Sequence, residues 1–235
     1  MIALDISELS AGFPGFRVAL LVAEGLAIPA AVPPAVSALL AAAEAEAAEA
    51  LAGRELAELP ELAAWRAAYK AFGVKKTSYR CSVERLLKAV ARGEGLPRVN
   101  ALVDLYNAVS VRHRLPVGAD DLARVTPPLA FRFAREGDSF VALGDPAATP
   151  DPPKPGEVVY ADAAKCLCRR WNWYQDARSA IRPDTAAAVL TVQGLGPSAG
   201  RVEAAAAELA GMLEAECGAR VAWAVAEAGR PRIEV

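Results

Sequence analysis

Histidine is almost missing from this chain of 235 residues, which contains only His113. A catalytic triad or a histidine-based proton shuttle would therefore have to use this one residue. His113 lies at the C-terminal end of an expected helix, where a solvated cation that interacts with the helix dipole is the simpler interpretation. We therefore do not assign His113 to catalysis.

Cysteine is also scarce, and the four present show no disulfide framework: Cys81, Cys166, Cys168 and Cys217. Such a pattern is typical of reduced thiols. Cys166 and Cys168 are separated by one residue instead of the two that are usual in zinc sites, and His113 is distant in sequence. We therefore expect no metal and no cofactor.

Long apolar runs are absent as well. The most apolar segment, FRVALLVAEGLAI, is interrupted by Glu24 and Gly25 and falls short of the ~18 residues that a membrane span needs. The first residues, MIALDISELS, do not combine a basic region with an apolar core, so they do not resemble a secretory signal. We expect a cytoplasmic protein without membrane association.

Charge is nearly balanced overall, at −2, but it is unevenly distributed. Residues 1–64 contain 2 basic and 9 acidic side chains, residues 65–135 contain 14 and 5, and residues 136–235 contain 10 and 14. A basic segment inside an acidic protein is what a surface for RNA phosphates looks like in sequence. Charges spread over several solvated faces would give the same count, and the sequence leaves both interpretations open.

The first half of the chain reads as two strands followed by helices. MIALDIS and FRVALLVAEGLAI are apolar or alternating segments that would meet at the turn SAGFPG. Helices are expected over residues 36–59, after a pair of prolines, over residues 61–72, and over residues 82–92 with Ser82 as its N-cap.

The second half is richer in strands. LAFRFAREGDSFVAL predicts a hairpin with strands over residues 129–134 and 140–143, while EVVYAD, CLCRRWNWYQ and AAVLTVQGL read as further strands. A helix over residues 198–216 and the strand RVAWAVAEA close the chain. Because regular βαβ alternation is missing, the pattern predicts an α+β fold, a mixed sheet packed with helices in a single globular domain.

The expected organisation has three parts within this domain. Residues 1–59 would supply an N-terminal strand pair and a long helix that pack on the main domain. Residues 60–195 would form the core, and residues 196–235 would complete it with a helix and a strand.

A polar stripe interrupts the otherwise apolar helix in VNALVDLYNAVSVRHRLPVGADDL, residues 99–122. At 100° per residue, Asn100, Asp104 and Asn107 fall within a narrow stripe beside the apolar arc. Such residues cost roughly 0.5 kcal/mol each in a helix interior relative to alanine. The stripe therefore indicates either hydrogen bonding or plain solvent exposure.

The same run, followed by LAFRFAREGDSF, resembles the B3/B4 domain of the phenylalanyl-tRNA synthetase beta subunit. FGVKKTSYRCSVERLL, GEVVYAD and RRWNWYQ resemble freestanding members of that family, and the resemblance covers about residues 60–195. It implies a tRNA-binding protein that hydrolyses the ester of a misacylated tRNA in trans. No motif resembles the ligase site of a synthetase, and we expect neither aminoacylation nor DNA binding.

Two departures from the family pattern concern specificity. The turn after the helix usually carries a histidine in bacterial synthetases, where this chain has Gly118. The later glutamate that helps to recognise a tyrosine hydroxyl has no counterpart near WNWYQDARSAIR. We therefore expect the recognised amino acid to differ from tyrosine.

Residue roles follow from this resemblance as hypotheses. Asn107, Ser110 and the backbone of Val117 and Gly118 would line the pocket and orient water or the carbonyl group. Asp104 is interpreted as a fixed hydrogen-bond acceptor within the structure. The substrate or tRNA would contact a further group: Lys75, Lys76, Arg80, Asn100, Trp171 and Trp173.

Several of these residues keep an alternative role. Trp171 and Trp173 would share a strand face, where they either stack a ring or fill the core. Lys75 and Lys76 either contact tRNA or belong to a solvated link. For the whole protein the alternatives to a deacylase are a tRNA-binding module without chemistry and a small-molecule amino-acid binder or hydrolase.

Overall fold

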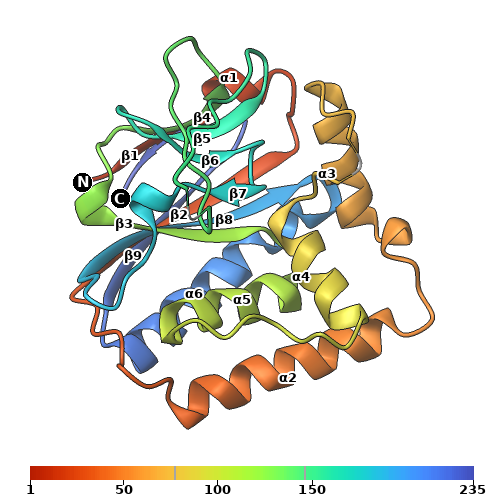
Figure 1. Ribbon diagram of the computed structural model, residues 1–235, viewed down its shortest axis with the longest axis vertical. Coiled ribbons are helices and arrows are strands. Elements are labelled where there is room, and N and C mark those ends of the chain that lie inside the picture. The colour runs from red at the N-terminus through yellow and green to blue at the C-terminus, as the bar shows by residue number, and fades with distance from the viewer. Residues whose placement is uncertain (77, 146) are drawn as a thin grey trace.

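Two β-sheets with helices on one side form the fold (Figure 1), in a computed structural model that describes residues 1–76, 78–145 and 147–235. The six-stranded sheet has the order β10 (Arg232–Glu234), β1 (Ala3–Asp5), β4 (Leu129–Phe133), β5 (Val158–Ala161), β6 (Cys166–Arg169) and β7 (Tyr174–Gln175). The four-stranded sheet has the order β3 (Val117–Asp121), β8 (Ala187–Leu195), β2 (Phe16–Glu24) and β9 (Arg220–Ala226). The predicted α+β class is therefore confirmed.

In the described ranges, the α-helices are α1 (Ser7–Ser10), α2 (Pro34–Leu51), α3 (Pro60–Ala71), α4 (Ser82–Ala91), α5 (Ala101–His113) and α6 (Val202–Cys217). Helices α2 and α3 begin at prolines, as the sequence predicts, because proline has the helical φ and needs no partner for an N–H group. Helix α2 ends earlier than predicted, before Gly53, whose φ is +68°. Among the described residues, no helix has both the length and the apolar character required to cross a membrane.

Strand β2, inside the four-stranded sheet, is buried on both faces, which explains why it is an apolar run without alternation. Val18 and Leu20 face one apolar cluster, and Ala19 and Leu21 face the other. The second cluster lies under α5 and α6, with α2 outside them (Figure 1), whereas the first joins strands of both sheets to residues of α2, α3 and α4. Strand β2, one of the two inner strands of this sheet, comes from the first 59 residues. The expected three-part division of the domain stays a prediction.

Two predicted strand pairings are wrong. Strands β1 and β2 do not meet in a hairpin: α1 lies between them, and β1 pairs with β10 and β4 in the other sheet. Strand β4 pairs with β1 and β5, not with residues 140–143, which form only isolated bridges. Asp138 turns the chain by accepting hydrogen bonds from Arg132, and Val141 donates its N–H to Asp176, so this segment leaves the sheet.

The segment CLCRRWNWYQ is likewise not one strand. It forms β6 and β7, joined by a turn in which Arg170 and Trp171 have positive φ values of 49° and 67°. Left-handed backbone at two successive residues other than glycine is costly and is held in place by packing. Trp171 and Trp173 therefore do not share a strand face.

Candidate active site

A cavity of about 420 Å³ lies where the edge strand of one sheet meets the edge strand of the other. Strand β3 and strand β7 line it, together with α4, α5 and the loop that precedes α5. Gln175 of β7 joins the two edges, since its side-chain amide donates to the carbonyl oxygen of Ala119 and to Oδ1 of Asp120. This junction is where the chain places its convergent polar groups.

Two residues of the polar stripe, Asn100 and Asp104, hold the start of α5 by hydrogen bonds to backbone N–H groups. Asn100 caps the helix by accepting a hydrogen bond from the N–H of Val103 at 3.0 Å, and Asp104 accepts one from the N–H of Val99 at 2.9 Å. Burial raises the pKa of Asp104 above its usual value, although these backbone hydrogen bonds and Arg98 oppose the effect. Neither Asp104 nor Asn100 lines the cavity.

Asn107 lies nearly two turns further along α5 and lines the cavity. It is only 5% exposed, and its side-chain amide has no hydrogen-bond partner within the described parts of the chain. An amide side chain offers both a hydrogen-bond donor and an acceptor to a ligand that enters the cavity. Asn107 is therefore positioned to bind a ligand.

Ser110 does not reach the cavity. Its hydroxyl is fully buried and donates to the carbonyl oxygen of Leu115 at 2.6 Å. This bond closes the end of α5, where Arg114 adopts a left-handed conformation with φ +56°. The contact supports a structural role for Ser110, away from the position in which it was expected to orient water.

Strand β3 exposes Gly118 to the cavity. A Cβ atom placed there would meet no heavy atom within 4 Å, so the glycine leaves open space where a side chain would fit. The cavity is correspondingly wider at the position where a histidine was expected from the family pattern.

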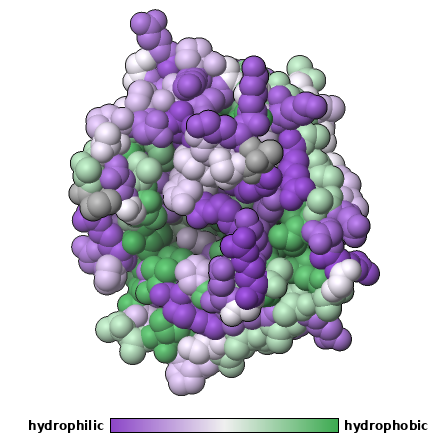
Figure 2. All heavy atoms as spheres, turned by 45° about the vertical axis from the view of Figure 1, so that its right-hand side comes forward, coloured by the Kyte–Doolittle hydropathy of each residue, from purple (hydrophilic) through white to green (hydrophobic). Residues whose placement is uncertain are grey.

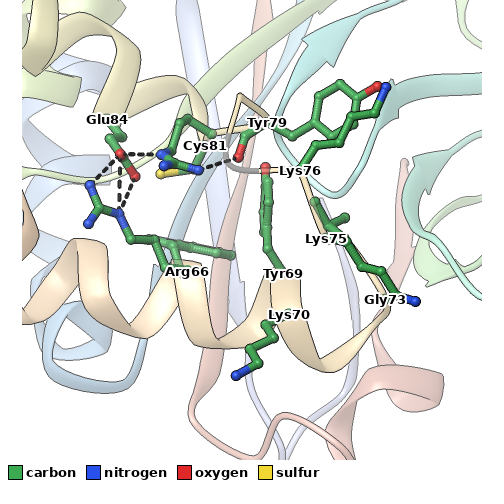
Figure 3. Close-up of a pocket in the computed structure, with 12 residues that line it drawn as sticks. Arg66, Tyr69, Lys70, Gly73, Lys75, Lys76, Tyr79, Cys81 and Glu84 are labelled. Atoms are coloured by element: carbon green, nitrogen blue, oxygen red, sulfur yellow. Dashed lines mark hydrogen bonds and ion pairs between the residues drawn. The ribbon is translucent and has the colours of Figure 1, made fainter.

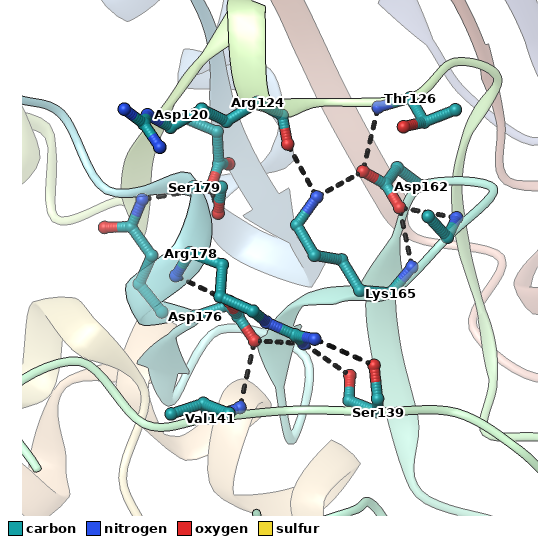
Figure 4. A network of polar contacts seen from close by, with 12 residues as sticks. Asp120, Arg124, Thr126, Ser139, Val141, Asp162, Lys165, Asp176, Arg178 and Ser179 are labelled. Atoms are coloured by element: carbon teal, nitrogen blue, oxygen red, sulfur yellow. Dashed lines mark hydrogen bonds and ion pairs between the residues drawn. The ribbon is translucent and has the colours of Figure 1, made fainter. Parts of the chain in front are cut away.

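Asp120 is a site residue that the sequence analysis missed. It is 4% exposed and accepts hydrogen bonds on Oδ1 from the hydroxyl of Ser179 at 2.6 Å and from Gln175 at 3.0 Å (Figure 4). Burial raises its pKa to about 7, against the opposing effect of these two donors. A carboxyl group with this pKa changes charge near neutral pH, as a general base requires.

The sequence contains one feature that could have indicated Asp120 as a site residue, namely two successive aspartates within a strand. Because side chains alternate across a strand, Asp120 and Asp121 must point to opposite sides. Asp121 accepts from the N–H of Ala123 at 3.0 Å and from the hydroxyl of Thr185 at 3.0 Å, and so fixes the following turn. Only Asp120 lines the cavity.

Two tyrosines near Asp120 supply neutral donors. The hydroxyl of Tyr160 is buried and has no hydrogen-bond partner among the described residues, and Tyr106 also lines the cavity. Burial raises the pKa of both hydroxyl groups, and the charge of Asp120 raises them further. Both tyrosines therefore stay protonated at neutral pH and present O–H groups.

A chain of side-chain amides forms another wall of the cavity. Tyr69 donates its hydroxyl to Oδ1 of Asn172 at 2.9 Å, and Asn172 donates to Oε1 of Gln193 at 3.0 Å. Gln193 in turn donates to the hydroxyl of Thr191 at 3.1 Å. These bonds fix the orientation of three cavity residues that come from the β6–β7 turn and β8.

The two tryptophans of the turn have different positions. Trp171 is fully buried in the core, where its ring packs edge-on against Trp65 and Phe16. Trp173 lines the cavity, and the guanidinium group of Arg170 lies 4.3 Å from its ring centroid. The core interpretation thus fits Trp171, and the ligand-contact interpretation fits Trp173.

A second cavity of about 610 Å³ contains Lys75, Lys76 and Arg80 (Figure 3). The carboxylate of Glu84 in α4 forms ion pairs with Nε of Arg80 at 2.7 Å and with the guanidinium group of Arg66 at 2.7 Å. Both arginines are therefore held against this buried carboxylate. Lys75 and Lys76 are exposed and form no ion pair within the described ranges. The two lysines, unlike Arg80, are free to contact a ligand.

The basic middle segment is largely neutralised by ion pairs. Its paired arginines include Arg98 with Glu44, Arg112 with Glu208, Arg114 with Glu61, and Arg132 with Asp138. His113 also contacts Glu208, with 2.6 Å between Nε2 and Oε2. On the side of the molecule that carries α3, hydrophilic side chains cross the middle of the surface with hydrophobic ones on both sides (Figure 2).

Other buried charges hold loops together. Asp162 accepts hydrogen bonds from the backbone of Thr126 and Ala164 and from Lys165, whose ammonium group also reaches the carbonyl oxygen of Arg124 (Figure 4). Burial opposes ionisation of Asp162, but these donors outweigh it and hold its pKa below the usual value. Asp162 and Lys165 both lie outside the first cavity.

Comparison with known proteins identifies the family. The model of the B3/4 domain family matches residues 64–213, and the chain belongs to that family. Solved structures that match include an N-terminal fragment of the phenylalanyl-tRNA synthetase beta-subunit from Pyrococcus horikoshii, with 14% identity and a TM-score of 0.49. That alignment covers 94% of this chain and 50% of the fragment, so the chain spans about half the length of that fragment. Among curated proteins, the comparison finds no match.

Proposed function

We propose that the first cavity hydrolyses the aminoacyl ester of a misacylated tRNA. The single observation that carries this proposal is the convergence of Asn107, Gly118 and Asp120 in one cavity of about 420 Å³, which is the size of a pocket for a small ligand. An amide without a partner, open space and a titratable carboxyl group are the parts that ester hydrolysis needs. Membership of the B3/4 family supports the choice of an aminoacyl ester.

The proposed reaction has two steps. Ionised Asp120 accepts a proton from a water molecule as the water oxygen attacks the carbonyl carbon of the ester. The amide of Asn107 donates to the carbonyl oxygen as that oxygen becomes negatively charged. The tetrahedral intermediate then breaks the bond to the ribose oxygen, and the proton on Asp120 passes to that oxygen, which gives a free amino acid and an uncharged RNA end.

Aromatic groups define the space for the amino-acid side chain. Trp173, Tyr106 and Tyr160 border the cavity, and the absence of a side chain at Gly118 widens it. We propose that this space admits a side chain that the cognate synthetase attaches in error, because selection by size in an apolar pocket favours any side chain that fits. The unfilled position at Gly118 favours a larger or differently shaped side chain than a pocket narrowed by histidine.

A panel of correctly and wrongly charged tRNAs tests this proposal. The purified protein is incubated with each member, and released amino acid is measured beside a control without protein. We expect selective release from one or a few misacylated tRNAs. Release from no member of the panel, with tRNA still bound, would instead favour a binding module. Neither release nor tRNA binding would favour a small-molecule amino-acid site.

A further inference from the structure

The two cavities share a wall. Tyr69 lines the second cavity and hydrogen-bonds Asn172, which lines the first. Tyr79 lines the second cavity, and its ring packs edge-on against Trp173 of the first, with 4.8 Å between centroids. The turn between β6 and β7 is therefore the partition, and a ligand in one cavity lies directly beside a ligand in the other.

The chemistry of the second cavity differs from that of the first. Aromatic and apolar groups from Trp65, Tyr69, Val74 and Tyr79 line it. Trp65 and Tyr69 are almost fully buried, and the half-buried Tyr79 is the most exposed of the three aromatic residues. The guanidinium of Arg170 stacks on Tyr79 from the side of the wall, 3.8 Å from the ring centroid. The second cavity thus offers flat aromatic surface, in contrast to the carboxyl and amide groups of the first.

Positive charge without a fixed counter-charge surrounds this aromatic surface. Arg66 and Arg80 share the carboxylate of Glu84, whereas three lysines that line the cavity make no ion pair in the part of the chain that the structure describes: Lys70, Lys75 and Lys76. Figure 3 shows these three side chains extending away from Glu84. The cavity therefore fits a molecule with a flat ring and a negative charge beside it.

We propose that the second cavity binds a nucleotide, namely one that precedes the esterified end of the RNA whose amino acid occupies the first cavity. A nucleobase supplies the ring that stacks on aromatic side chains, and its phosphate supplies the anion for the lysines. This inference rests on the proposed function for the identity of the RNA. Nucleotide binding itself does not require that the first cavity be catalytic.

Equilibrium binding of a short uncharged RNA, the trinucleotide CCA, tests the proposal. The double variant Lys75→Ala/Lys76→Ala is compared with Lys88→Ala/Lys154→Ala, which removes the same charge from exposed lysines outside the cavity. We expect the first pair to weaken binding about tenfold, because phosphate contacts dominate RNA affinity, and the second pair to change it less than twofold. Equal weakening by both pairs would overturn the proposal.

The ring requirement has a separate test. Tyr79→Leu keeps the charge of the cavity and removes one stacking surface, so CCA binding should weaken about tenfold. Inorganic tripolyphosphate, which has the charge and no ring, should compete poorly with CCA for the wild-type protein. Competition as strong as that of CCA itself would show a general anion surface and contradict a nucleotide site.

The outcomes also separate this inference from the proposed function. CCA binding that depends on Lys75, Lys76 and Tyr79, in a protein that releases no amino acid from any charged tRNA, would support the nucleotide site and reject the deacylase. Release of amino acid by a protein whose CCA binding is unchanged by substitution of these three residues would support the deacylase and reject the nucleotide site.

Discussion

Gln175 and Asp120 connect the free edges of the two sheets, with 3.0 Å between the amide nitrogen of one and the carboxylate oxygen of the other. The bond matters for function because it fixes one oxygen of a buried acid, together with Ser179. The acid thereby stays oriented beside the cavity while burial raises its pKa to about 7. The account of the site depends most on this residue.

The rate of ester hydrolysis should rise with pH and level off above about 7 as Asp120 ionises. Asp120→Asn should lower the rate at pH 8 about 10²–10⁴-fold and remove the inflection, because the amide cannot accept the proton from water. The measurement is the release rate from a charged tRNA between pH 5.5 and 8.5, with spontaneous hydrolysis subtracted. Asp121→Asn is the control and should keep the inflection. An unchanged pH profile in Asp120→Asn would show that Asp120 is not the general base.

Stability should change with pH in the opposite direction. The folded pKa of Asp120, about 7, exceeds the ordinary aspartate value of 3.8, so the folded protein binds the additional proton. The stabilisation is complete below about pH 3.8 and is lost as the pH rises to about 7. Asp120→Asn should therefore gain more stability relative to wild type at pH 8 than at pH 4.5, as measured by urea unfolding. A smaller gain at pH 8 than at pH 4.5 would contradict this sign.

Asn107→Ala should slow ester hydrolysis about 10²–10³-fold, the usual effect of removing one donor to the developing oxyanion. Its free energy of unfolding should change little, since the amide has no partner among the described residues that would be lost. Asn100→Ala, on the same helix, is the matched control: it removes an N-cap and should cost about 1 kcal/mol of stability. The hydrolysis rate of Asn100→Ala per folded molecule should equal that of wild type. A large loss of stability in Asn107→Ala, with an unchanged rate per folded molecule, would assign Asn107 to structure.

Gly118→Leu should narrow the first cavity and shift its selectivity toward smaller amino acids. The expected stability change is within about 0.5 kcal/mol, because the new side chain meets open space and the backbone there is not left-handed. Release rates from tRNAs charged with a large and a small amino acid provide the test, and Gly118→Ala provides the graded control. Unchanged selectivity in both variants would place the amino-acid side chain elsewhere.

Comparison of Trp171→Ala with Trp173→Ala tests whether the first tryptophan belongs to the core and the second to the cavity wall. Trp171 is fully buried, and its loss should cost about 3–5 kcal/mol. Trp173→Ala should cost less stability and weaken substrate binding, seen as a higher KM in steady-state release. An equal loss of stability in both variants would contradict the division between core and cavity wall.

Much of the fold followed from local pattern. Proline starts located α2 and α3, apolar periodicity located α5, and apolar runs located β2, β8 and β9. The pairing of strands did not follow, because it depends on contacts between distant segments. Strand β1 illustrates this: it pairs with β10 at the other end of the chain.

The site was predictable in part. Motif resemblance located Asn107 and Gly118, and the structure brings both into one cavity. It missed Asp120, because the significance of this carboxyl group comes from burial by Ser179 and β7, which are remote in sequence. It also placed Ser110 and Trp171 in the site, whereas a hydrogen bond to Leu115 and a left-handed turn direct them into the interior.

The most direct test of the central claim is the lifetime of the ester on a charged tRNA that is fully bound by excess protein. A susceptible misacylated tRNA is mixed with wild-type protein or with the Asn107→Ala/Asp120→Asn double variant, and the remaining ester is followed with time. The account predicts rapid loss of the ester with wild type and slow loss with the double variant. A bound ester that survives in wild-type protein as long as in buffer, for every tRNA that binds, would contradict hydrolysis in this cavity.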